Sequence, residues 1–395
     1  MDRSSGVVTV AEGTGYHPAR SRVPATVSQG GRLPRRVLIH RPRTGEQMVT
    51  EVPVTDVLVA VHVDTGEHDD AESLRARVAA LEGAGVHALT FAPGPDGGLT
   101  AVEAAAFAAA WTERVGLVAV VNPVHAEPFH LSNQLSSLDR ISRGRAGWWL
   151  DVVDDVAHAR AHGTDPVGSE DATALAQDVA EVVEAARLLW DSWEDGALIA
   201  DRTTGRFLDA ERVRHVDFVG RRFSVKGPAL LPRPPQGHVP VLAEARWLPA
   251  DARDVTVVRA PGETNTVGGP ALVDVAVTGE PGHVAAAVGR VVDQIARWAA
   301  AAVAGTTGAS LVGRQDRGHP RPLVVRLVPD RTEEAWAVVG QVLAALHARG
   351  LAAPPPGPGR TLRDHLGLER PEGRAGDPTA RPAPEHETTT IGARP

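Results

Sequence analysis

The chain has 395 residues, of which 43% are hydrophobic, so it can bury one large core or two modest ones. Its formal net charge of −8 argues against nucleic-acid partners, because phosphate binding needs a clustered basic face. The absence of cysteine excludes disulfides, thiolate nucleophiles and cysteine-ligated metal centres. No stretch approaches 18 uncharged apolar residues, and the first 22 residues hold no continuous apolar run, so we expect no membrane span, no secretory signal and a cytoplasmic location.

Residues 1–50 show no clean periodicity and are interpreted as an extension with a short hairpin across 35–54. Order is expected to begin with the apolar run "DVLVAVHVD" (56–64), a strand. The following stretch, 69–85, predicts a helix with Asp69 as its N-cap, Glu72 three residues later, and Leu74, Val78 and Leu81 on one face.

The same alternation of apolar strands and amphipathic helices continues along the chain. Strands are predicted at 86–91, 116–122, 146–153, 239–245, 255–258 and 271–277, with a further candidate at 309–312. Helices are predicted at 100–115, 130–142, 174–195, 282–303 and 332–350. Seven or eight such units predict an α/β fold, a TIM-like (β/α)₈ barrel, and no G-x-G-x-x-G follows a strand to favour an open dinucleotide-binding sheet.

Two stretches interrupt the pattern. Residues 194–238 are too long for an ordinary loop and predict a functional insertion near the barrel mouth. After residue 352 the chain becomes proline-rich and polar, and we expect disorder there except at "TLRDHLGLERP" (361–371). The predicted organisation is an extension (1–50), a barrel (51–352) and a tail (353–395) with a docking segment at 360–371.

Within the stretch "EPFHLSNQLSSLDRISRGRAGWW" (127–149), the leucine spacing predicts a helix outside the barrel, a tight turn at "SRGRAG" and a strand that enters the barrel wall. Leu135, Leu138, Ile141 and Trp148 are interpreted as packing residues. Trp190 and Trp193 are interpreted in the same way.

Three collinear blocks carry a family resemblance: residues 127–149, residues 188–242 and "TLRDHLGLERP". They resemble the luciferase-like flavin monooxygenases, in the branch of nitrilotriacetate, pristinamycin IIA and dibenzothiophene-sulfone monooxygenases. The resemblance implies a bacterial-luciferase-type barrel that binds reduced FMN at its mouth. It also implies FMN supply by a separate NAD(P)H-dependent flavin reductase, oxygenation of a small organic substrate with O₂, and a homo-oligomer or a pair with a paralogue.

The resemblance also places five candidate cofactor contacts. Asn122 and His125 stand in "NPVHAEP", where the family has "STTYNEP"; Ser169 and Thr173 align with the family's "H…RY" pair; and Arg246 lies in "EARWLP", where the family has a glycine-rich phosphate loop. Because these contacts are substituted, the alternative is a non-catalytic homologue that acts as a structural or regulatory partner of an active paralogue. A deazaflavin F420-dependent oxidoreductase is the third alternative.

No residue is assigned as catalytic from the sequence, and no metal is expected. The acidic and histidine-rich stretch 62–70 is interpreted as a solvated loop that caps a helix. Its member His62, at the carboxyl end of a strand, is the candidate proton donor.

Overall fold

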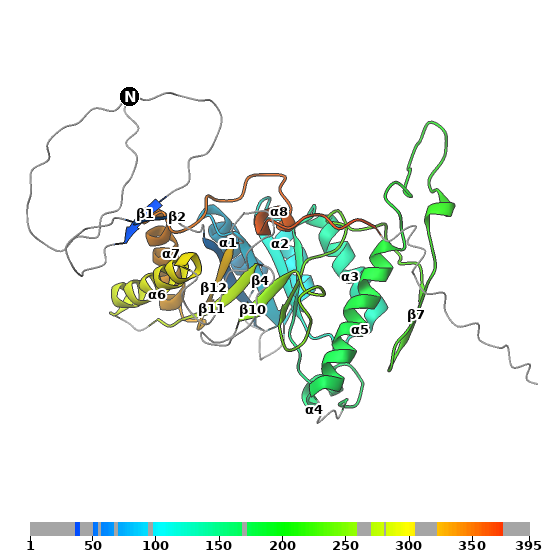
Figure 1. Cartoon of the computed structure of the whole chain (residues 1–395), viewed down its shortest axis with the longest axis horizontal. Helices are drawn as coiled ribbons and strands as arrows, with labels where there is room; N and C mark the ends of the chain where they lie inside the picture. Colours follow the sequence, from blue (N-terminus) through cyan, green and yellow to red (C-terminus); the bar gives the residue numbers. More distant parts are fainter. Residues whose placement is uncertain are drawn as a thin grey trace, which may run out of the picture.

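The computed structural model describes residues 36–39, 50–53, 57–66, 70–93, 98–167, 172–258, 270–279, 282–304 and 322–373. Eight parallel strands close into a barrel in the order β10-β11-β12-β3-β4-β5-β6-β9 (Figure 1). The strands are β3 (Val57–Thr65), β4 (Ala88–Pro93), β5 (Gly116–Val121), β6 (Ala146–Leu150), β9 (Val241–Glu244), β10 (Val255–Val258), β11 (Ala271–Val277) and β12 (Leu323–Pro329). The predicted eight-stranded barrel is therefore confirmed.

Helices surround the barrel (Figure 1), and each helix predicted from the sequence is present after a strand of the barrel. They are α1 (Ala71–Gly83), α2 (Ala101–Ala109), α3 (Pro128–Ile141), α4 (Val156–Ala161), α5 (Ala172–Asp191), α6 (Val284–Ala304), α7 (Glu333–Ala348) and α8 (Leu362–Leu366). Between β9 and β10, residues 245–254 form turns without a helix. None of the helices in the described part of the chain combines the length and hydropathy that a membrane crossing requires.

The helix starts follow from local capping. The N-cap of α1 is Asp70, whose side chain accepts a hydrogen bond from the Ser73 amide, so the prediction of Asp69 as the cap is wrong by one residue. Thr100 and Glu103 form a reciprocal capping box at α2. Glu127 caps α3 by accepting from the amides of Phe129 (3.1 Å) and His130 (2.6 Å), which fixes the loop that enters this helix.

The paired tryptophans of β6 face opposite sides of the barrel wall. Trp148 is fully buried in the layer between the strands and the surrounding helices, together with Leu135 and Leu138 of α3. Trp149 belongs to the cluster that fills the barrel lumen. The packing predictions for Leu135, Leu138 and Trp148 are confirmed, whereas the one for Ile141 is wrong, since 54% of Ile141 is exposed at the end of α3.

One barrel strand was missed by the sequence analysis, and one predicted strand is not tested by the structure. The eighth strand, β12, was not predicted, and the candidate strand at 309–312 lies outside the described residues. At the other end of the chain, β1 (Arg36–Ile39) and β2 (Thr50–Pro53) pair antiparallel, so the predicted hairpin is confirmed.

The amino end of the barrel is closed by the carboxyl-terminal segment. Leu362 of α8 is 2% exposed and joins the lumen cluster with Leu366. Its methyl groups lie so close to Gly116 and Gly147 that a Cβ on either glycine would approach them to 2.7–2.8 Å. The expected disorder between 353 and 360 is wrong, because the chain is held there: the Ala353 amide donates to the Val57 carbonyl at 2.9 Å.

The insertion after α5 begins and ends at the amino end of the barrel. At its base, Arg233 pairs with Asp191 at 2.9 Å and donates to the carbonyl of Pro371 at 2.9 Å. A hairpin of β7 (Val216–Val219) and β8 (Ser224–Gly227) then runs back along α5, and the Arg221 amide donates to Glu181. The prediction that the insertion lies near the mouth is therefore wrong for its base, and only the hairpin tip extends towards the carboxyl ends of the strands.

Candidate ligand site at the carboxyl ends of the strands

A pocket of about 480 Å³, here called the mouth pocket, opens at the carboxyl ends of β4, β5 and β6. Its apolar wall includes Ala92, Val120 and Leu131. Its polar lining consists of Thr100, Asn122, Glu127, His130, Gln134, Asp151, His158 and His162. Small-molecule pockets typically enclose about 300–1,000 Å³, and barrels of this type carry their active sites at this end. The mouth pocket is therefore the candidate ligand site.

Asn122 shapes the edge of this pocket. It directly follows β5, and its side-chain amide donates to the Val153 carbonyl at 2.6 Å. Its amide oxygen accepts from the Val124 backbone N–H at 3.0 Å. Because both ends of the amide bind backbone, Asn122 holds the loop after β5 against the segment after β6.

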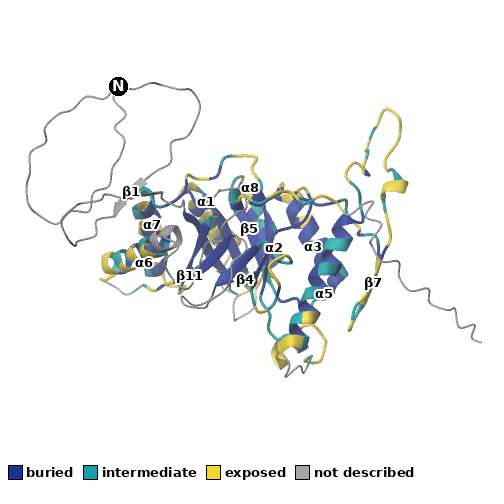
Figure 2. Cartoon of the chain, in the orientation of Figure 1, coloured by how far each residue is buried: buried dark blue, intermediate teal, exposed yellow. Residues whose placement is uncertain are grey.

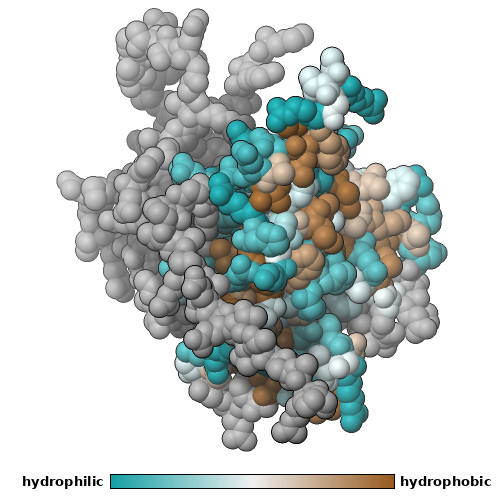
Figure 3. All heavy atoms as spheres, turned by 90° about the vertical axis from the view of Figure 1, so that its right-hand side faces the viewer, coloured by the Kyte–Doolittle hydropathy of each residue, from teal (hydrophilic) through white to brown (hydrophobic). Residues whose placement is uncertain are grey.

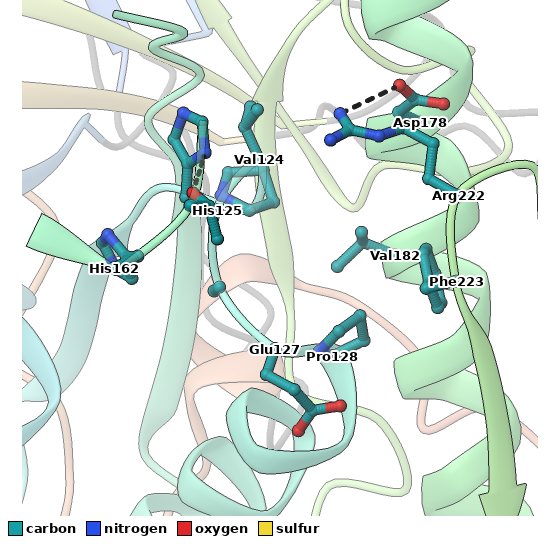
Figure 4. A pocket seen from close by; sticks show the side chains of 12 residues that line it. Val124, His125, Glu127, Pro128, His162, Asp178, Val182, Arg222 and Phe223 are labelled. Atoms are coloured by element: carbon teal, nitrogen blue, oxygen red, sulfur yellow. Dashed lines mark hydrogen bonds and ion pairs between the residues drawn. The ribbon is translucent and has the colours of Figure 1, made fainter. Parts of the chain in front are cut away.

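A second cavity of about 300 Å³, the back pocket, is lined on one side by the loop 123–127 (Figure 4). It shares Ala126, Glu127 and His162 with the mouth pocket. The tip of the insertion hairpin covers it with Arg222 and Phe223, and Arg222 pairs with Asp178 of α5 at 3.6 Å. The insertion therefore contributes to the wall of a cavity that adjoins the candidate site.

His125 lies in the back pocket. Its Nδ1 is 3.1 Å from the Thr164 hydroxyl, and its Nε2 is 3.2 Å from Asp154. Burial lowers the pKa of His125 below its usual value, although the charge of Asp154 acts in the opposite direction. The His125 ring thus joins the loop after β5 to the loop after β6.

A polar network crosses the upper lumen of the barrel beneath the mouth. His62 of β3 contacts the Thr90 hydroxyl through Nδ1 at 2.9 Å and Asp64 through Nε2 at 2.8 Å. Burial raises the pKa of Asp64, but the hydrogen bond and charge of His62, followed by those of Arg331, hold this pKa below its usual value. The candidate proton donor His62 therefore points into the barrel and already has a carboxylate partner.

The second half of this network is an ion pair. Arg326 of β12 binds Asp274 of β11 through two hydrogen bonds of 2.7 and 2.6 Å, and these residues are register partners in the sheet. The guanidinium of Arg326 also lies 3.9 Å from the ring centroid of Trp149 and 3.3 Å from the Thr90 hydroxyl. Sequence reasoning missed this pair, because β12 was not predicted; an arginine inside the apolar run "LVVRLV" was the available signal.

The five predicted cofactor contacts do not converge on one pocket. Asn122 lines the mouth pocket and His125 lines the back pocket. Thr173 is exposed in the first turn of α5, Arg246 belongs to the turn after β9, and Ser169 lies outside the described residues.

The turn after β9 does not fit a phosphate group. Residues 245–254 contain no glycine that would let backbone N–H groups approach an anion closely. Arg246, the one predicted phosphate contact, pairs with Glu244 at 2.7 Å and lies 4.8 Å from the ring centroid of Trp247. The phosphate of a ligand would therefore find no backbone cradle in this turn.

Comparison with known proteins finds a matching family model and similar solved structures. The family model of luciferase-like monooxygenases matches residues 55–393. A riboflavin lyase solved with modified FMN and riboflavin has a TM-score of 0.60 and 17% identity, over 80% of this chain and 97% of that one.

Curated relatives match over shorter stretches. Nitrilotriacetate monooxygenase component A of Aminobacter aminovorans is 39% identical over 135 residues, which are 34% of this chain and 29% of that protein. A pristinamycin IIA synthase subunit of Streptomyces pristinaespiralis is 32% identical over 206 residues, 51% of this chain and 68% of that subunit. The chain thus covers less than a third of the length of the first of these relatives. The family model, in contrast, spans most of the chain, so the chain belongs to the luciferase-like monooxygenase family.

Proposed function

We propose that this chain binds reduced FMN in the mouth pocket and acts as a monooxygenase on a small organic substrate with O₂. The observation that carries the proposal is the mouth pocket itself, which lies at the carboxyl ends of β4, β5 and β6 in a barrel of this family. Reduced flavin would supply the electrons for oxygen activation. The name of the relative "component A" supports a second component, and we propose a flavin reductase for that role.

In this proposal, the residues of the chain position and enclose the ligand. Asn122 fixes the pocket edge, and Asp151 and His130 present polar groups to the ligand. His125 supports the loop from behind, through Thr164 and Asp154. Arg246 would reach a phosphate only after leaving Glu244, so a phosphate contact there is the weakest element of the site.

The test is an anaerobic titration of the purified chain with reduced and oxidised FMN, followed by flavin fluorescence and absorbance. Saturable binding of reduced FMN is expected. A Val102→Trp variant, which fills the mouth pocket from α2, should weaken this binding at least tenfold. Val219→Trp on the exposed hairpin is the matched control and should bind like the parent chain, since 60% of Val219 is exposed. Absence of binding to either flavin form would refute the proposal.

A second candidate function is a partner chain without its own chemistry. Two observations favour it: the glycine-free turn with the Glu244–Arg246 pair, and a relative named as one subunit of a synthase. Under this alternative, the purified chain binds no flavin, whereas a complex with a catalytic luciferase-like chain does. Reduced-FMN titrations of the chain alone and of that complex separate the two candidates.

A further inference from the structure

The back pocket is a cavity that the proposed function does not use. Figure 4 shows Val124 and His125 of the loop after β5 on one side of it, with Val182, Arg222 and Phe223 on the opposite side. Its volume of about 300 Å³ is twice that of a cavity that holds one benzene molecule, about 150 Å³. The back pocket therefore has room for a ring that carries a polar substituent.

The outer wall of the back pocket is the tip of the β7–β8 hairpin. None of the tip residues 219–224 is buried (Figure 2). The Arg221 amide donates to Glu181 at 2.8 Å, and its guanidinium donates to Gln177 at 2.8 Å. Figure 3 looks onto the side of the molecule that carries this hairpin and shows apolar atoms gathered there with polar atoms around them. The back pocket is thus closed on this side by a thin wall that polar contacts hold against α5.

Two buried polar atoms in the lining of the back pocket make no hydrogen bond. They are Nε2 of His125 and Oδ1 of Asp178, and neither has a hydrogen-bond partner among the residues that the structure describes. The His125 side chain is 1% exposed, and its Nε2 lies 3.2 Å from Asp154 without the geometry of a hydrogen bond. Such a group is unusual in a folded protein, because it has given up water and gained no partner. Two such atoms in one cavity indicate a ligand that supplies the partners.

The charges around the back pocket are balanced. Asp178 lies 3.7 Å from the guanidinium of Arg221 and 3.6 Å from that of Arg222, and both contacts are too long for hydrogen bonds. Glu127, the other carboxylate of the lining, accepts from two amides at the start of α3. A cation would find the charge of Asp178 already compensated, and an anion would meet both carboxylates. The back pocket therefore favours a neutral ligand.

We propose that the back pocket binds a small neutral organic molecule that carries a hydroxyl or amide group on an apolar body. The polar group donates a hydrogen bond to Oδ1 of Asp178, accepts one from Arg222 and contacts Nε2 of His125. The apolar body packs against Val182 and Phe223. This site does not depend on flavin binding in the mouth pocket, so the flavin titration and the experiment below fail independently.

The test is isothermal titration calorimetry of the full chain, without flavin, with benzyl alcohol as the probe. Saturable binding to one site per chain is expected. Protonated benzylamine and benzoate have nearly the same size, but each should bind at least about tenfold more weakly, because a charge loses its water in the back pocket without gaining an unpaired counter-ion.

A variant of Asp178 separates the polar contact from the apolar one. Asp178→Leu keeps the size of the side chain and removes the acceptor. It should weaken the binding of benzyl alcohol about tenfold, whereas toluene, which has no polar group, should bind as well as before or better. The comparison of two ligands in two proteins isolates the hydrogen bond from any change in the shape of the cavity.

Further variants identify the cavity. Val124→Phe fills the back pocket and should weaken benzyl alcohol and toluene at least about tenfold, whereas Val102→Trp fills the mouth pocket and should leave both affinities unchanged. Phe218 and Phe223 stack on the hairpin with centroids 5.5 Å apart, and of these two Phe223 lines the back pocket. Phe223→Ala should therefore weaken both ligands about three- to tenfold, and Phe218→Ala is its matched control.

The thermal midpoint of each variant reports on folding. A crystal structure of the parent chain soaked in benzyl alcohol needs no variant, and it should show the probe between His125 and Asp178. Absence of saturable binding, equal binding of a charged analogue, or a probe located elsewhere in the crystal overturns the proposal. An equal loss of benzyl alcohol and toluene affinity in a folded Asp178→Leu variant overturns it as well.

Discussion

At the scale of single residues, the lumen network contains a largely buried ion pair. Arg326 and Asp274 face each other on adjacent strands, and their side chains are only 8% and 21% exposed. Removing one partner of a buried pair leaves a charge without its counter-ion, whereas replacing both by apolar groups is often neutral.

We therefore expect Arg326→Met to lower the free energy of unfolding by about 3–5 kcal/mol. The double variant Arg326→Met/Asp274→Leu should recover most of that loss. Urea unfolding of the parent, the double variant and each single variant completes the cycle. Equal losses in Arg326→Met and the double variant would show that the network is not a coupled pair.

The candidate site residues illustrate what the sequence could not determine. Asn122 and His125 were placed correctly at the carboxyl end of β5, because the strand boundary and the resemblance both fix that position. The sequence could not show that Asn122 binds the Val153 carbonyl or that His125 contacts Thr164 and Asp154, since these partners lie about 30–40 residues away. Arg246 was predicted to face a phosphate, but it has a carboxylate partner two residues earlier in the chain.

At the scale of elements, the closure of the barrel by α8 is the main feature beyond the predicted alternation. Continuous apolar runs and amphipathic helices predicted seven of the eight barrel strands and the surrounding helices. The role of "TLRDHLGLERP" could not be derived in this way, because Leu362 contacts Gly116 and Gly147 across more than 200 residues of chain.

Leu362→Ala is expected to lower the free energy of unfolding by about 2–5 kcal/mol, because it empties a fully enclosed position in the lumen. Leu230→Ala, the same change at a 71% exposed position, should alter it by less than about 0.5 kcal/mol in the monomer. Unfolding in guanidinium chloride measures the change in the free energy of unfolding for both variants. A small effect of Leu362→Ala would mean that α8 detaches without cost and does not close the barrel.

At the scale of the whole molecule, buried titratable groups tie distant parts of the chain together and make its stability depend on pH. His87, just before β4, accepts from the Val59 amide through Nδ1 and contacts the Pro354 carbonyl through Nε2. Burial lowers the pKa of His87 to about 4, and burial likewise lowers the pKa of His365 in α8 to about 4. Burial raises the pKa of Asp139 in α3 to about 6.

These pKa changes act on stability with different signs. A histidine whose pKa falls from 6.5 to about 4 on folding binds its proton more readily when unfolded, so its contribution is complete above pH 6.5 and is lost as the pH falls towards 4. A pKa difference of one between the folded and unfolded states corresponds to about 1.4 kcal/mol, so one such histidine accounts for roughly 3 kcal/mol. Asp139 acts oppositely: its raised pKa costs stability above pH 6, and protonation relieves that cost as the pH falls.

His87 and His365 together outweigh Asp139, and the lowered pKa values of His125 and His238 act in the same direction as theirs. We therefore expect the free energy of unfolding to fall between pH 6.5 and pH 4 by at least roughly the contribution of one histidine. His365→Leu should flatten this dependence, because an apolar side chain at that position has no proton to bind on unfolding. His215→Leu, at an exposed position in the insertion after α5, should leave the slope unchanged. Urea unfolding of the three proteins at pH 7, 5.5 and 4.5 gives the slopes. An equally steep fall in His365→Leu and the parent chain would show that α8 does not take part in the acid response. The acid sensitivity of the barrel would then rest on the other buried histidines, among them His87, at the contact between β3 and the segment that leads into α8.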